Sequence, residues 1–187
     1  IETSGKSTSL KKAIKYLKKK KIKHITLREP GGTNFSEKLR SLMLSKKSKL
    51  NYKTDLFLFM ASRSENFDKI LKQNYKKKVI LIDRFIDSTL AYQVYGKKES
   101  LKFINNIHKQ ILGKIKPDIT FVLKVKKQSF LSRLKNRRSR NRYDNFPVKF
   151  YIKAQNSFLK LSKKKKSHVI LDSSENSPDL QKKILII

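Results

Sequence analysis

The chain opens with Ile1-Glu2-Thr3-Ser4-Gly5-Lys6-Ser7-Thr8, and this stretch decides the fold. It supplies every position of the phosphate-loop pattern G-x-x-x-x-G-K-[S/T] except the first glycine, which would fall one residue before Ile1. In this pattern backbone N–H groups around Gly5 bind phosphate, Lys6 reaches the β- and γ-phosphates, and the Ser7 hydroxyl can coordinate Mg²⁺. The pattern predicts an ATP site over residues 1–8. Taken alone, it also fits a helix that merely starts after a glycine.

The phosphate-loop pattern further predicts a β-strand ahead of the missing glycine, at the centre of the sheet. Without this first strand, its two neighbours would lose hydrogen-bond ladders and the buried faces would have a gap. We therefore expect the natural polypeptide to be longer at its N-terminus. An initiating Met directly before Ile1 in the complete gene would contradict this expectation.

Hydrophobic periodicity predicts strands that alternate with helices along the chain. Runs rich in β-forming residues predict strands at 24–27, 78–82, 119–125 and 168–171. Amphipathic stripes predict helices at 7–21, 36–44 and 54–71, with further helical stripes at 103–111 and 150–161. This alternation indicates an α/β protein with a doubly wound parallel sheet. A length of 187 residues suits one domain, 1–187.

The composition excludes several classes of protein. The net charge is +33, from 47 Lys+Arg against 14 Asp+Glu, but lysine is spread along the whole chain, as an A/T-rich coding sequence would produce. We therefore expect no specific nucleic-acid partner. No run approaches the roughly 18 to 20 apolar residues of a membrane span and no secretion signal is visible, so we expect a cytoplasmic protein. The chain has no cysteine, and structural zinc is not expected.

Four further segments occur in a characteristic order. They are 28–33 (REPGGT), 59–63 (FMASR), 83–85 (DRF) with 88–93 (STLAYQ), and 141–143 (NRY). Together with the phosphate loop they resemble bacterial thymidylate kinases over nearly the whole chain. The resemblance implies a P-loop nucleoside monophosphate kinase fold and the reaction of ATP with dTMP to give ADP and dTDP, for dTTP and DNA synthesis. It also implies Mg²⁺ as cofactor and a homodimer formed by helix packing.

The resemblance assigns the acceptor side of the site. Phe59 stacks on thymine and Arg63, four residues later on the same helical face, contacts the base edge or the nearby phosphate. Arg84 grips the phosphate of dTMP, which suits a bidentate guanidinium. Asp83 resembles a Walker-B aspartate that holds Mg²⁺ together with Ser7. A core role for Phe59 and a surface ion pair for Arg84 are the competing interpretations.

Further residues complete the implied dTMP site. Ser88 and Tyr92 resemble the part of the pocket that touches deoxyribose and base, with Tyr92 crowding a ribose 2′-hydroxyl. Thr89 and Gln93 complete this wall. Glu2 falls where the family carries an acidic residue, near the acceptor sugar and magnesium. The loop 28–33, with Arg28 and Pro30, lies beside the acceptor phosphate.

A cluster of arginines lies between two predicted helices, in a chain that otherwise uses lysine. Its members are Arg133, Arg137, Arg138, Arg140 and Arg142. Thymidylate kinases carry the catalytic basic residue either in the phosphate loop or on a lid; this loop has Thr3 and Ser4, so the chain resembles the lid-arginine type. We predict a lid over about 137–147, with Arg137 and Arg142 joining Lys6 and Arg84 in catalysis. A solvated basic run is the simpler alternative. The loop 172–174 is predicted to pack near adenine.

Two other functions remain compatible with these residues. The first is a P-loop kinase for another nucleoside monophosphate or for a deoxynucleoside. The second is a basic nucleic-acid-binding module on this fold, which predicts strongly salt-dependent DNA binding and indifference to Lys6→Ala.

Overall fold

The computed structural model describes residues 1–137, 141–163, 165–174 and 178–186. Strands β1 (His24–Arg28) and β2 (Val79–Asp83) form one parallel pair, and β3 (Thr120–Lys124) and β4 (His168–Asp172) form another. Each strand lies within one residue or so of its predicted bounds. Among the described residues, the two pairs share no ladder.

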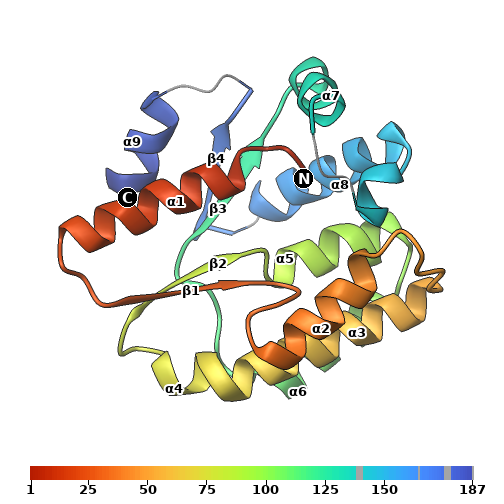
Figure 1. Cartoon of the computed structure of the whole chain (residues 1–187), viewed down its shortest axis with the longest axis horizontal. Helices are drawn as coiled ribbons and strands as arrows, with labels where there is room; N and C mark the ends of the chain where they lie inside the picture. The colour runs from red at the N-terminus through yellow and green to blue at the C-terminus, as the bar shows by residue number, and fades with distance from the viewer. Residues whose placement is uncertain (138–140, 164, 175–177, 187) are drawn as a thin grey trace.

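The helices lie around the strand pairs (Figure 1). Helices α2 and α3 pack side by side on one side of β1 and β2, and α1 contacts α9 on the other. Helix α8 packs on β3 and β4. The bounds are α1 (Lys6–Lys19), α2 (Asn34–Leu44), α3 (Tyr52–Asn66), α4 (Lys72–Asn74), α5 (Ile86–Thr89), α6 (Leu101–Leu112), α7 (Lys127–Lys135), α8 (Val148–Lys163) and α9 (Pro178–Ile186).

Capping side chains explain where two helices begin. The Thr33 hydroxyl accepts a hydrogen bond from the Ser36 amide at 3.1 Å, and Asn51 Oδ1 accepts one from the Thr54 amide at 2.9 Å. Such caps satisfy amides that have no partner within the helix. Because the capped amides already belong to the first turn, α2 and α3 begin two residues before the predicted starts at 36 and 54.

Two π-helical segments interrupt the expected α-helices. The predicted helix 54–71 is α-helical to Asn66 and π-helical over η1 (Phe67–Leu71). A second segment, η2 (Leu90–Gly96), follows α5 directly and buries Leu90 to Val94. Isolated π-helical turns occur frequently at functional sites. Here η2 carries the Ala-Tyr-Gln sequence of the predicted acceptor site.

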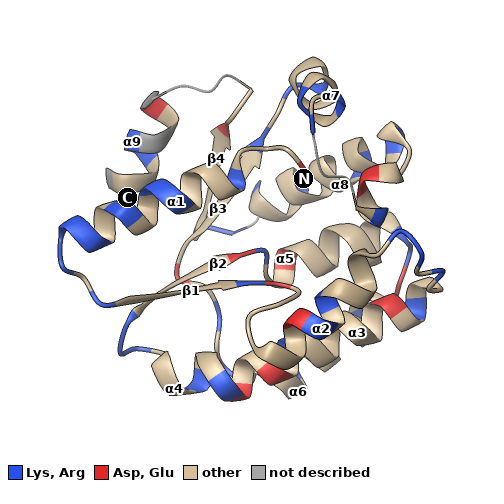
Figure 2. Cartoon of the chain, viewed as in Figure 1, with Lys and Arg blue, Asp and Glu red and all other residues tan. Residues whose placement is uncertain are grey.

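Lys and Arg occur on many elements, including α1, α4, α7 and α9 (Figure 2). This distribution fits a general bias towards lysine better than a dedicated basic surface. No helix in the described part of the chain combines the length and apolar character needed to cross a membrane.

Gly32 occupies a position that a side chain would strain. Its φ is +117°, and an added Cβ would overlap the Leu27 side chain and lie 2.8 Å from Asn66 Oδ1. We expect Gly32→Ala to lower the free energy of unfolding by about 2 kcal/mol or more, from backbone strain and overpacking. Gly113→Ala is the control for backbone strain, since Gly113 also has positive φ but no atom within 4 Å of an added Cβ; its cost should be smaller than that of Gly32→Ala because it lacks the overlap. Urea unfolding measures both, and equal losses would refute the packing argument.

Candidate active site

A cavity of about 580 Å³ lies at the N-terminal loop. Its lining includes residues that follow or end strands of both pairs, such as Asp83 of β2 and Ser173 after β4. It gathers predicted site residues that are far apart in the sequence. Those that line it are Glu2, Thr3, Ser4, Gly5, Lys6, Ser7, Thr8, Pro30, Phe59, Arg63, Asp83, Arg84, Ser88, Thr89, Tyr92, Gln93 and Arg137. The predicted phosphate loop and the predicted acceptor residues therefore share one cavity.

Three predicted site residues are not among those lining the cavity. Ile1 is buried in the core, although its carbonyl accepts hydrogen bonds from Ser4 and Lys6. Arg28 is exposed and forms an ion pair with Glu37 at 2.7 Å. Arg142 pairs with Asp55, and its guanidinium lies 5.0 Å from the centre of the Tyr143 ring. Arg138 and Arg140 lie outside the described residues.

The N-terminal loop has the backbone of a phosphate-binding turn. Thr3 and Gly5 have φ of 51° and 85°, in the left-handed region, and α1 begins directly afterwards at Lys6. The first amides of a helix have no intrahelical partner and favour anions. The Lys6 ammonium lies 2.6 Å from the Ile1 carbonyl, and burial together with the charge of Arg84 lowers the pKa of Lys6 to about 8. A bound anion would favour the charged form of this lysine.

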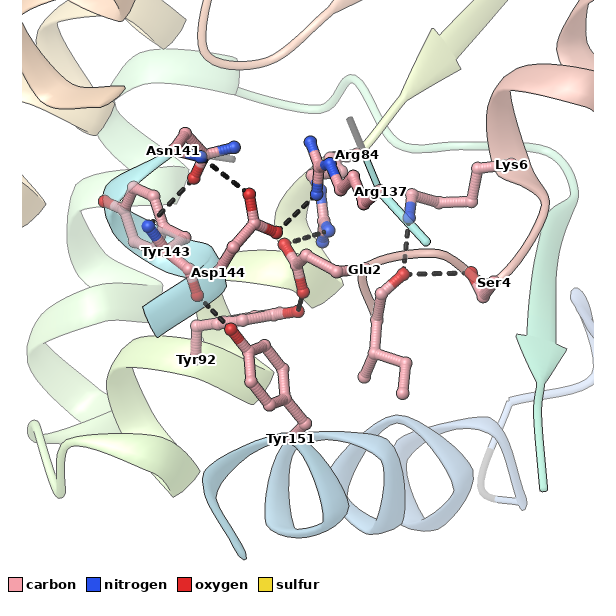
Figure 3. A network of polar contacts seen from close by, with 11 residues as sticks. Glu2, Ser4, Lys6, Arg84, Tyr92, Arg137, Asn141, Tyr143, Asp144 and Tyr151 are labelled. Carbon is pink, nitrogen blue, oxygen red and sulfur yellow. Dashed lines mark hydrogen bonds and ion pairs between the residues drawn. The ribbon is translucent and has the colours of Figure 1, made fainter. Parts of the chain in front are cut away.

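Glu2, Arg84 and Tyr92 form a polar network beside the loop (Figure 3). Arg84 donates to Glu2 Oε1 at 2.7 Å, and Tyr92 donates to Glu2 Oε2 at 2.6 Å. The Arg84 guanidinium also lies 5.3 Å from the centre of the Tyr92 ring. Burial alone would raise the pKa of Glu2, but the charges of Arg84 and Lys6 outweigh it and lower that pKa to about 2. The network keeps a carboxylate and a guanidinium charged inside the cavity.

Asp83 and Ser7 supply oxygen ligands of the kind that Mg²⁺ prefers. Asp83 ends β2, and its Oδ1 is buried without a hydrogen-bond partner among the described residues. Ser7 lies in the first turn of α1, and both side chains line the cavity. A buried carboxylate oxygen without a partner is costly unless a cation or ordered water satisfies it. Asp83 and Ser7 therefore fit a site that would hold Mg²⁺.

Helix α3 contributes Phe59 and Arg63 to the cavity lining. The Phe59 ring meets the Tyr143 ring edge-to-face with centroids 6.2 Å apart. Arg63 is 2% exposed and pairs with Glu29, whose oxygen lies 2.7 Å from Nε. Burial raises the pKa of Glu29, and the Arg63 charge opposes that rise. An aromatic ring beside a fixed guanidinium suits a planar base that carries hydrogen-bond acceptors.

The predicted lid segment is anchored by its own polar contacts. Asn141 and Asp144 form a capping box around the short 3₁₀ helix η3 (Arg142–Asn145), and Arg137 pairs with Asp144 (Figure 3). Tyr151 on α8 donates to the Tyr143 carbonyl. Asn141 thus stands as a helix cap in the structure.

Several cavity residues were missed by the sequence analysis. Glu29, Arg40 and Tyr143 line the cavity without an assigned role, and Arg40 donates to the Pro30 carbonyl at 2.6 Å. Arg133 donates to the Ser174 carbonyl at 2.8 Å, and the predicted adenine loop contributes Ser173 to the lining. The use of arginine in a lysine-rich chain, which singled out the lid, could also have singled out Arg40.

Known proteins resemble this chain in sequence and in structure. The sequence model of the thymidylate kinase family matches residues 1–184. A thymidylate kinase of Thermosipho africanus is 33% identical over 94% of this chain and 88% of that protein, and one of Ehrlichia chaffeensis is 36% identical over 94% and 86%. The crystal structure of the Ehrlichia chaffeensis thymidylate kinase superposes with a TM-score of 0.78 at 28% identity, covering 100% of this chain and 93% of that one.

Proposed function

The chain belongs to the thymidylate kinase family, and we propose that its cavity holds the ATP triphosphate at residues 1–8 and dTMP between Arg84 and Phe59. The enzyme is a dTMP kinase, which transfers the γ-phosphoryl group of ATP to dTMP and gives dTDP. The P-loop nucleoside monophosphate kinase fold follows from the same matches. One observation carries the site proposal: the phosphate loop and the acceptor residues line one cavity.

The proposed chemistry is an in-line transfer without a covalent enzyme intermediate. The acceptor is a phosphate oxygen that is already ionised near neutral pH, so no general base is required. What remains for the protein is to position both nucleotides and to stabilise negative charge on the transferring group. Within the cavity, the loop amides donate hydrogen bonds to this negative charge, and Lys6 and Arg84 supply positive charge that stabilises it. Arg137 also lines the cavity but is paired with Asp144, so its full charge reaches the transferring group only when it leaves that carboxylate.

We propose Mg²⁺ as cofactor, held by Asp83 and the Ser7 hydroxyl. When bound, Mg²⁺ neutralises charge on the β- and γ-phosphates. The buried Asp83 Oδ1 supports this assignment. Asp83→Asn should raise the Mg²⁺ concentration needed for half-maximal activity, and an unchanged requirement would count against the site.

We propose that residues 1–187 form a single domain and that residues 137–147 form its lid. Arg142 is committed to Asp55 in this structure, and Tyr143 donates to the same carboxylate at 2.5 Å. A catalytic role for Arg142 therefore requires that it leave Asp55 when substrates bind. Comparing kcat of Arg137→Ala with that of Arg142→Ala tests this, and an unchanged kcat for Arg142→Ala would assign it a structural role.

Exposed apolar side chains support a homodimer. Phe35 and Leu42 on α2, Phe57 on α3 and Phe103 on α6 are each more than 40% exposed. Phe57 and Phe103 meet edge-to-face, which joins two of these helices into one surface. Apolar surfaces of this kind mark interfaces. Equilibrium sedimentation measures the assembly.

We also propose a cytoplasmic location, where ATP is available and a cysteine-free chain needs no oxidising compartment.

A panel of acceptors with ATP and Mg²⁺ tests the function. We expect kcat/KM for dTMP to exceed that for dGMP, UMP and thymidine, because Phe59, Arg63 and Tyr92 surround the acceptor end. Faster turnover of any of these three would favour a kinase for another nucleotide or a deoxynucleoside.

A further inference from the structure

Arg63 is surrounded by buried polar side chains from three segments of the chain. Its partners are Glu29 after β1, Thr89 at the end of α5 and His108 on α6. All three partners are less than 9% exposed. The guanidinium also lies 5.3 Å from the centre of the Phe85 ring. The group is therefore fixed from several directions, although it lines the cavity.

The hydrogen bonds of Arg63 leave little donor capacity unused. Nε and Nη2 lie 2.7 and 2.6 Å from the same Glu29 oxygen, Oε2. Nη1 donates to the Thr89 hydroxyl at 2.9 Å and contacts His108 Nε2 at 2.5 Å. A guanidinium has five N–H groups. With the Nη2–Glu29 ion pair counted as one contact, the described residues leave one Nη2 N–H of Arg63 for a ligand.

The contact with Arg63 determines the state of His108. A guanidinium only donates hydrogen bonds, so His108 Nε2 must accept and the proton must sit on Nδ1. Burial and the charge of Arg63 lower the pKa of His108 to about 3, which keeps the ring neutral near pH 7. His108 Nδ1 is buried and has no hydrogen-bond partner in the described part of the chain. The ring therefore engages Arg63 while its other nitrogen stays unsatisfied.

We propose that His108 is a positioning residue for acceptor recognition. Its neutral Nε2 holds one N–H of Arg63 so that the remaining Nη2 N–H stays available to the nucleotide. A ligand group that matches this donor is a carbonyl oxygen on the edge of a base. This inference rests on the proposed placement of the acceptor nucleotide beside Phe59 and Arg63.

Two amide variants of His108 test the role of Nε2. His108→Gln can place an amide oxygen near the position of Nε2, whereas the shorter His108→Asn cannot reach it. We expect His108→Asn to raise KM for dTMP by about tenfold or more, the effect of losing a hydrogen bond to a charged group. KM for ATP and kcat should change by less than about twofold. His108→Gln should restore KM for dTMP to within about threefold of the original enzyme.

The outcomes separate this inference from the function itself. Failure of the unmodified enzyme to phosphorylate dTMP would overturn the proposed function. Two results would overturn only the role of His108. One is normal activity with an unchanged KM for dTMP in His108→Asn. The other is an equal change in KM for ATP and for dTMP that is the same in both variants. ¹⁵N NMR of the unmodified protein provides a check that does not depend on whether the variants fold. A neutral ring with an unprotonated Nε2 at pH 7 supports the proposal, and an imidazolium or an Nε2–H tautomer refutes it.

Discussion

Lys6→Ala should lower kcat for dTDP formation by at least about a hundredfold, the order observed when a group that stabilises transition-state charge is removed. Lys6 is the first residue of α1, directly after the loop, and lines the cavity with Arg84 and Asp83. Alanine leaves the helix intact because it is a good helix former. The loss should therefore appear in turnover and not in stability, as measured by a coupled assay for ADP and by thermal unfolding.

Lys11→Ala is the matched control. Lys11 lies on the same helix, is exposed and does not line the cavity. It should retain activity within about twofold, since surface substitutions away from the core and the active site have small effects. The nucleic-acid-binding alternative predicts no such contrast: DNA binding would be strongly salt-dependent and indifferent to Lys6→Ala. Retained turnover in Lys6→Ala would exclude the charge-stabilising role.

The lowered pKa of Lys6 adds a pH dependence to this prediction. Since that pKa is about 8 in the free enzyme, Lys6 is charged below pH 8 and loses its proton as the pH rises through that value. The pH profile of kcat/KM reports groups of the free enzyme. We expect kcat/KM for ATP to fall above about pH 8. Lys6→Arg keeps its charge at these pH values, so its profile should lack this fall even though its activity is lower.

The sequence predicted those features that depend on local pattern. The strands follow from hydrophobic periodicity and the phosphate loop from a short motif, whereas the cavity residues from Phe59 to Gln93 follow from the resemblance to thymidylate kinases. The π-helical form of η1 and η2 could not be predicted, because an apolar stripe over one or two turns fits both an α-helix and a π-helix. The local sequence therefore identified which residues reach the site but not the backbone that carries them.

Pairings between distant residues escaped the sequence analysis. Arg142 and Asp55 are 87 positions apart, and Arg63 and His108 are 45 apart. No motif marks Asp55 or His108, so nothing in the sequence indicated that Arg142 would be paired or that Arg63 would be held by an imidazole. Arg28 likewise forms an ion pair with Glu37 instead of lining the cavity. Charge partners are set by the packing of helices, which a pattern of residue types does not encode.

Arg84→Lys should lower kcat/KM for dTMP by about a hundredfold while KM for ATP changes little. The substitution keeps the positive charge but loses the planar fork that can bind two phosphate oxygens at once. Each hydrogen bond between charged groups contributes about 1.5–3 kcal/mol, so the loss of one well-formed bond accounts for an effect of this order. Steady-state kinetics with dTMP varied at saturating ATP measures it.

Glu2 provides the matched test of what Arg84 binds. In this structure the Arg84 fork donates to Glu2, so an incoming phosphate dianion must compete with that carboxylate or share the guanidinium with it. Glu2→Gln removes the competing charge and keeps the shape. If Arg84 binds the acceptor phosphate, Glu2→Gln should not weaken the binding of dTMP as Arg84→Lys does. The two effects on KM for dTMP should then differ by at least about tenfold. Equal losses would mean instead that Arg84 acts by holding Glu2, which would then be the group that contacts the nucleotide.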